Sequence, residues 1–127
     1  MKQYILFLII VVVFAHCDQQ KEENESSIAG VWKLTEVLAD PGDGSGVFRE
    51  VESDKEITIY EDNTVKSNGQ LCRMSLDGTN PTEGYYSLED STIISGDCTL
   101  QFEIEGGVLI IHYPCIEPCG EKYVKVP

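Results

Sequence analysis

Residues 99–113 read TLQFEIEGGVLIIHY, and this stretch decides the fold class of the chain. Leu100, Phe102 and Ile104 alternate with polar residues, which is the two-residue period of a strand with one buried face. Two glycines follow at 106–107 and lead into a second apolar run, VLIIHY. Two such runs joined by a glycine pair are typical of an antiparallel β-hairpin.

The chain from residue 28 onward repeats this pattern and shows no helical stripe. Further short β-rich runs lie at 30–39, 47–51, 55–60, 64–69, 84–90, 91–97 and 121–126, separated by turn residues. In the first run, Trp32, Leu34 and Leu38 are expected on one face. The side chains expected to form the core are Trp32, Leu34, Ile57, Ile59, Leu100, Phe102 and Ile104.

Eight or nine short antiparallel strands in sequence order leave no room for helical crossovers. Such a meander must bury one face and protect its edge strands. Closure into a barrel achieves both, so we predict an all-β fold in which an up-and-down meander closes into a small barrel of eight or nine strands. A two-sheet sandwich is the alternative, although no long Greek-key connection is visible.

The first strand begins with Gly30-Val31-Trp32, which resembles the G-x-W signature of lipocalins. The stretch 29–127 as a whole is similar to small lipocalin-like domains of bacterial lipoproteins. This resemblance implies that Trp32 packs across the closed floor of the barrel, and that the loop 40–46 caps the open end. The strands are shorter than those of full-length lipocalins, so the resemblance implies the fold better than it implies a cavity.

Four cysteines lie in the domain, at Cys72, Cys98, Cys115 and Cys119. An even number in an exported chain favours two disulfides over a zinc site, because the spacing is not that of paired C-x-x-C knuckles. In an up-and-down meander all four would lie at one end of the barrel. We favour Cys72–Cys98 with Cys115–Cys119, and the pairing Cys98–Cys115 with Cys72–Cys119 stays open.

Other motifs give little support for chemistry. The loop 40–46, DPGDGSG, lacks the ligand spacing of a calcium loop, and we expect no metal and no cofactor. His112 has no nucleophile constellation near it in sequence, so we expect no enzyme. Four tyrosines are candidates for the mouth of a ligand site: Tyr85, Tyr86, Tyr113 and Tyr123.

The N-terminus has the features of an export signal. Lys2 precedes an apolar run at 5–15 that is about half the length of a membrane-spanning helix. The run ends at Cys17 in a sequence, FAHC, that resembles the lipobox of bacterial lipoproteins, although Phe14 and His16 depart from its usual residues. The resemblance implies a signal peptide at 1–16 and a lipid anchor on Cys17. A plain signal peptide is the alternative.

The stretch 17–28 is expected to be a disordered acidic tether, because it has almost no apolar residue to bury. It looks like the charged export signals of some Gram-negative surface lipoproteins, which implies the outer membrane or cell surface. Without residues 1–16 the chain holds eight basic and 22 acidic residues, a formal charge of −14 at pH 7. Such a charge argues against nucleic acid as a partner, whereas acyl chains could still hold the protein at a membrane.

These observations favour a lipid-anchored, non-enzymatic envelope lipoprotein that binds a small apolar or amphipathic ligand in a lipocalin-like barrel. The alternative is a filled barrel that acts as a protein-interaction module, for example a protease inhibitor or a component of an envelope complex. A cavity would favour the first hypothesis, and a solid core with an exposed apolar loop would favour the second.

We predict that Cys17 carries lipid, because the apolar run stops there and a very polar stretch follows. Growth of expressing cells with a radioactive fatty acid should label the wild-type protein and leave Cys17→Ala unlabelled. Equal labelling of both proteins would contradict the prediction.

Overall fold

The structure is a computed structural model that describes residues 27–127. The predicted signal peptide, Cys17 and most of the predicted tether lie outside the described residues. Residues 27–127 contain no helix that is long and apolar enough to span a membrane. Their strands are β1 (Gly30–Ala39), β2 (Arg49–Glu50), β3 (Glu56–Ile59), β4 (Thr64–Ser67), β5 (Thr82–Ser87), β6 (Thr92–Ser95), β7 (Cys98–Glu105), β8 (Val108–His112) and β9 (Cys119–Lys125).

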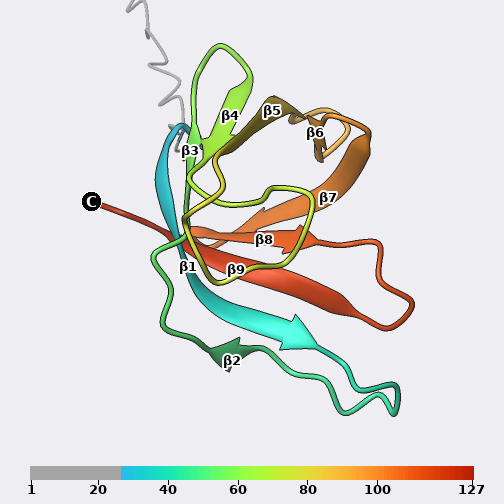
Figure 1. Ribbon diagram of the computed structural model, residues 1–127. Coiled ribbons are helices and arrows are strands. Elements are labelled where there is room, and N and C mark those ends of the chain that lie inside the picture. Colours follow the sequence, from blue (N-terminus) through green and yellow to red (C-terminus); the bar gives the residue numbers. More distant parts are fainter. Residues whose placement is uncertain (1–26) are drawn as a thin grey trace, which may run out of the picture.

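Eight of these strands form a closed antiparallel barrel. The order is β1-β3-β4-β5-β6-β7-β8-β9, and β9 pairs back with β1 from Trp32↔Lys125 to Ala39↔Cys119 (Figure 1). The two-residue strand β2 adds to β1 outside the barrel through the pairs Glu36↔Glu50 and Val37↔Arg49. The predicted all-β meander barrel is therefore confirmed, with the predicted run 47–51 reduced to this short extra strand.

The up-and-down order gives the barrel two distinct ends. The end where β1 begins, here called the Trp32 end, carries residues 27–29 and the short turns 60–63, 88–91 and 106–107. The other end, called the disulfide end, carries the longer connections 40–48, 68–81 and 113–118. The two ends therefore differ in how much chain is available to cover them.

The barrel interior is filled by side chains. The hydrophobic ones with 5% exposure or less are Trp32, Leu34, Ile57, Ile59, Val65, Leu71, Ile93, Leu100, Phe102, Leu109, Ile111 and Tyr123. Of the residues predicted for the core, Ile104 is the exception, because it is 38% exposed. Pairing of β6 with β7 ends at Thr92↔Gln101, so Ile104 extends beyond β6 and has no neighbour strand on that side.

A β-bulge in β1 corrects a second expectation. The register with β9 shifts between Leu34 and Glu36, so one extra residue is inserted into β1 there. Because side chains alternate along a strand, the extra residue reverses which positions face inward. Val37 packs against the core in place of Leu38, which the simple alternation had predicted on the face of Trp32.

The glycine of the G-x-W sequence has a direct structural reason. Gly30 has φ of +138°, and a Cβ at this position would lie 2.7 Å from Cε of Lys125. The Lys125 side chain crosses here to place its ammonium group 5.7 Å from the ring centroid of Trp32. The Trp32 indole donates a hydrogen bond to the Ile28 carbonyl, at 2.8 Å, which holds the entering chain against the barrel.

Truncation of Trp32 should remove a large part of the core packing. We expect Trp32→Ala to lower the free energy of unfolding by about 3–5 kcal/mol, the usual cost of deleting a buried aromatic side chain. Tyr85→Ala is the matched control, because Tyr85 is 67% exposed and its loss should change stability by less than about 0.5 kcal/mol. Denaturant titration of the two variants measures both values, and a similar shift in each would contradict the expectation.

Candidate functional site

The disulfide end is closed by the connection between β4 and β5. Leu71, in this connection, is fully buried, and its amide donates to the Thr82 hydroxyl at 2.9 Å. Gly69 allows the connection to fold tightly, because a Cβ there would lie 2.5 Å from the Asp77 carbonyl oxygen and 3.2 Å from Cγ of Lys55. The segment 69–81 thus covers the end of the barrel as a packed lid, here called the covering loop.

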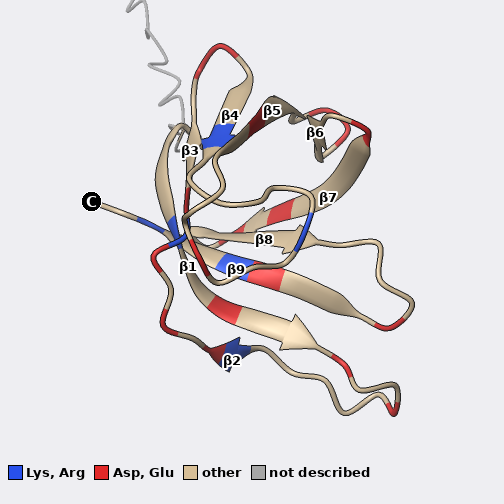
Figure 2. Cartoon of the chain, viewed as in Figure 1, with Lys and Arg blue, Asp and Glu red and all other residues tan. Residues whose placement is uncertain are grey.

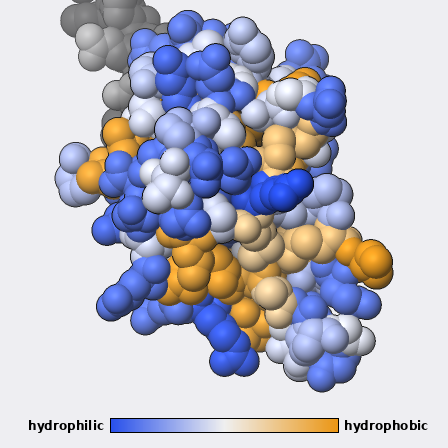
Figure 3. Space-filling model, viewed as in Figure 1, coloured by the Kyte–Doolittle hydropathy of each residue, from blue (hydrophilic) through white to orange (hydrophobic). Residues whose placement is uncertain are grey.

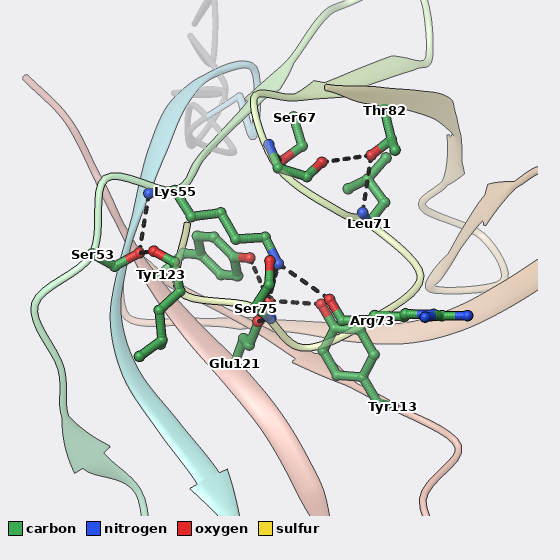
Figure 4. A network of polar contacts seen from close by, with 12 residues as sticks. Ser53, Lys55, Ser67, Leu71, Arg73, Ser75, Thr82, Tyr113, Glu121 and Tyr123 are labelled. Atoms are coloured by element: carbon green, nitrogen blue, oxygen red, sulfur yellow. Dashed lines mark hydrogen bonds and ion pairs between the residues drawn. The ribbon is translucent and has the colours of Figure 1, made fainter. Parts of the chain in front are cut away.

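Below the covering loop lies a fully buried ion pair. Nζ of Lys55 is 2.8 Å from one carboxylate oxygen of Glu121 and 3.0 Å from the other, and both side chains have 0% exposure (Figure 4). The same ammonium lies 3.4 Å from the Arg73 carbonyl. The Ser75 amide donates to Glu121 at 3.0 Å. The pair therefore joins the start of β3, the strand β9 and the covering loop.

Two tyrosines complete the hydrogen bonds of this carboxylate. The hydroxyl groups of Tyr113 and Tyr123 donate to one oxygen of Glu121 at 2.6 and 2.5 Å. Burial raises the pKa of both tyrosines, and the nearby negative charge adds to this effect. Burial also lowers the pKa of Lys55, while the Glu121 carboxylate opposes part of that change. Both tyrosines are therefore neutral donors at physiological pH.

The Glu121 carboxylate is saturated with hydrogen bonds, whereas the nearby Ser75 hydroxyl is buried and has no hydrogen-bond partner. The Glu121 carboxylate accepts five hydrogen bonds, from Lys55 (two), Ser75, Tyr113 and Tyr123. A buried carboxylate whose hydrogen bonds are all made fixes a structure rather than providing a reactive group. The network therefore acts as the latch of the covering loop.

The loop 40–46 does not provide the cover that the lipocalin resemblance implied. Its Asp40 carboxylate accepts hydrogen bonds from the amides of Gly42, Asp43, Gly44 and Gly46. These bonds lower the pKa of Asp40 and keep the carboxylate ionised. Asp40 thus shapes its own loop, and the covering loop closes the barrel instead.

Both disulfides lie at the same end as the latch. Cys72 pairs with Cys98 and Cys115 pairs with Cys119, each with a Cα–Cα distance of 6.0 Å. This is the pairing that we favoured from the sequence. The Cys72–Cys98 bond ties the covering loop to the start of β7, so the loop is held both by a covalent bond and by the ion pair.

The four tyrosines predicted at a ligand mouth do not come together. Tyr123 is fully buried and Tyr113 is partly buried, and both belong to the latch. Tyr85 is on the outer face of β5. There Tyr85 lines a small pocket of about 360 Å³, together with Ile94. Tyr86 lines a different, larger pocket at the Trp32 end, where its hydroxyl donates to the Tyr60 carbonyl at 2.9 Å.

That pocket is an open groove of about 970 Å³ at the Trp32 end. Its apolar lining consists of Ile28, Tyr86, Leu88, Phe102 and Ile104. Leu88 and Ile104 are 59% and 38% exposed. The volume lies near the upper limit of the roughly 300–1,000 Å³ that is usual for small-molecule sites.

The stagger of two neighbouring strands produces the groove. The last contact of β7 with the β6 side is the hydrogen bond from the Phe102 amide to the Ser91 carbonyl, at 2.9 Å. Beyond that point β7 pairs only with β8, up to Glu105↔Val108. The inward-facing side of β7 therefore continues past the edge of β6 and exposes Ile104 to the groove.

The charged groups of the groove are both acidic. Glu61 and Glu103 line it, and Asn63 and two serines supply its remaining polar groups. Glu103 lies 3.5 Å from Nε2 of His112, a nitrogen that is buried and has no hydrogen-bond partner. Apolar walls with carboxylates beside them suit a ligand with an apolar body and a cationic or hydrogen-bond-donating head.

In the part of the chain that the structure describes, no group of three or more His, Cys, Asp or Glu side chains is placed to hold a metal ion.

Comparison with known protein families, with curated proteins and with solved structures finds no match for this chain.

The latch predicts a strong asymmetry between single and double substitutions. Glu121→Leu or Lys55→Met should each lower the free energy of unfolding by about 3–5 kcal/mol, because each leaves a buried group without its charged partner. The double variant Lys55→Met/Glu121→Leu should be less destabilised than the sum of the single changes, since it removes both charges.

The exposed pair Lys66–Glu83 is the matched control, with side chains 58% and 78% exposed. Lys66→Met and Glu83→Leu should each cost less than about 1 kcal/mol. Additive effects at Lys55 and Glu121, measured by denaturant titration, would show that the two groups do not form a coupled pair.

Proposed function

We propose that this protein is a lipid-anchored, non-enzymatic envelope protein that binds a small amphipathic ligand in the groove at the Trp32 end. The observation that carries the proposal is the groove itself, an apolar site of ligand size with acidic groups beside it. The filled interior and the latch move this site away from the barrel axis, where the lipocalin resemblance would place a ligand.

The chemistry of the groove specifies the ligand class. The walls made by Phe102, Ile104 and Leu88 offer apolar contact to a chain or ring. Because Glu61 and Glu103 are the charged side chains that line the groove, a cationic head is attracted and an anionic head is repelled. The ligand is therefore an amphiphile with a positively charged or donating head.

The lipid anchor supports this function by location. Cys17 lies ten residues before Ser27, and Ser27 and Ile28 line the groove. Ten residues span at most about 33–36 Å when extended. An acylated Cys17 would therefore keep the groove within a few nanometres of the membrane, where amphiphilic molecules concentrate.

Two amphiphiles of equal chain length test the ligand class. Dodecylammonium should bind the purified protein more tightly than dodecanoate, measured by calorimetry below the micelle concentrations. Leu88→Asp and Ile104→Asp should weaken binding of the apolar chain of dodecylammonium, whereas Glu61→Gln with Glu103→Gln should reduce the preference for the ammonium head. The expected directions follow from the loss of apolar contact and of charge, respectively.

Ile94→Asp is the control, because Ile94 lies on the outer face of β6, away from the groove, and is 48% exposed. It should leave binding unchanged. Absence of saturable binding, or an equal loss in Ile94→Asp and Ile104→Asp, would contradict the groove as the binding site.

A further inference from the structure

The connection between β8 and β9 forms a small stapled loop at the disulfide end. The Cys115–Cys119 bond closes a ring of only five residues, and Pro114 and Pro118 lie beside the two cysteines. The Tyr113 amide donates to the Cys119 carbonyl at 3.3 Å, so the base of the loop continues the strand pairing. A disulfide and two prolines restrict the backbone, which makes this loop conformationally preorganised.

The stapled loop displays one apolar side chain completely. Ile116, near the tip of the ring, is 102% exposed, more than any other large hydrophobic residue among the exposed ones in 27–127. Figure 3 shows hydrophobic surface protruding where this loop extends from the barrel in Figure 1. An exposed side chain on a rigid loop loses little freedom on binding, so it can act as an anchor for a partner.

Acidic side chains lie in the stapled loop and in the neighbouring loop 40–46. Glu117 follows Ile116 directly, and its side chain reaches within 3.6 Å of where a Cβ on Gly42 would be. The Asp40 amide donates to the Pro118 carbonyl at 3.1 Å, which joins the loop 40–46 to the stapled loop. Hydrogen bonds lower the pKa of Asp40 and of Asp43, so both carboxylates are charged. Figure 2 shows acidic residues in both loops.

We propose that the stapled loop is a protein-docking site that inserts Ile116 into an apolar pocket whose rim carries Lys or Arg. The apolar tip specifies the pocket, and the carboxylates of Glu117, Asp40 and Asp43 specify the charge of its rim. An anionic lipid surface is a poor occupant because these carboxylates repel it. The groove of a second copy is also a poor occupant, since Glu61 and Glu103 line it.

This site is independent of the proposed ligand site. The stapled loop lies at the disulfide end and the groove at the Trp32 end, with the filled barrel between them. Loss of ligand binding in the groove would therefore leave the docking proposal intact, and the reverse also holds.

Photocrosslinking in the cells that make the protein tests the docking site. The full chain carries benzoylphenylalanine at position 116, and a control chain carries it at position 85, where Tyr85 is also exposed. Position 116 should give one discrete protein adduct that position 85 does not give. Addition of Glu117→Lys and Asp43→Lys should reduce the adduct about tenfold, because the charge attraction to a basic rim is reversed.

The captured protein is then purified, and its affinity for the wild-type chain is compared with its affinity for variants of the stapled loop. Ile116→Ala should weaken its affinity for the otherwise wild-type chain by about tenfold or more, since the buried part of the side chain is lost. Ile116→Leu should bind within about threefold of wild type, because a leucine conserves volume and hydrophobicity. Cys115→Ser/Cys119→Ser should also bind more weakly, because the loop is no longer preorganised.

The crosslinking and affinity measurements also distinguish the alternative occupants of the docking site. A lipid adduct, an adduct to a second copy, no adduct at all, or equal adducts from positions 116 and 85 would each overturn the proposal. A captured protein that binds Ile116→Ala as tightly as wild type, or that binds regardless of Glu117→Lys and Asp43→Lys, would overturn it as well.

Discussion

The buried pair of Lys55 and Glu121 is the interaction on which the closed end of the barrel depends. Removing two charges from water costs several kcal/mol per ion, and only close pairing with further hydrogen bonds compensates for it. Here the compensation comes from the Ser75 amide and from two tyrosines, so it requires the covering loop and β9 in their observed places. The latch therefore specifies one position for a long loop that contains few apolar side chains.

The latch also fills the disulfide end of the barrel. Tyr123, Leu71 and the ion pair occupy the axis of the barrel at the disulfide end, and the disulfide Cys72–Cys98 holds the cover in place. The Trp32 end has shorter connections. There the Lys125 ammonium group contacts the Trp32 ring and donates a hydrogen bond to the Ser27 carbonyl. The groove of the proposed ligand site therefore lies at the end that carries neither a disulfide nor the covering loop.

Strand alternation predicted most of the fold, because it depends on burial of one face and is visible in a single sequence. It also contained a signal for Glu121 that we did not use: Tyr123 faces inward, so the residue two positions before it does as well. The same alternation applies to Lys55, which lies two residues before the inward-facing Ile57 in the predicted run 55–60, although a lysine is ordinarily expected in solvent. The groove was not predictable, because it results from the stagger between β6 and β7 and not from a motif.

The charge of the domain connects the two proposed surfaces. Residues 27–127 contain seven basic and 18 acidic residues, a formal charge of −11. Such a field attracts cationic groups from a distance and repels anionic ones, and salt weakens both effects. The groove at one end and the stapled loop at the other each combine apolar surface with carboxylates. The acidic field would therefore raise the rate at which partners arrive, while the apolar contacts would determine how long they stay.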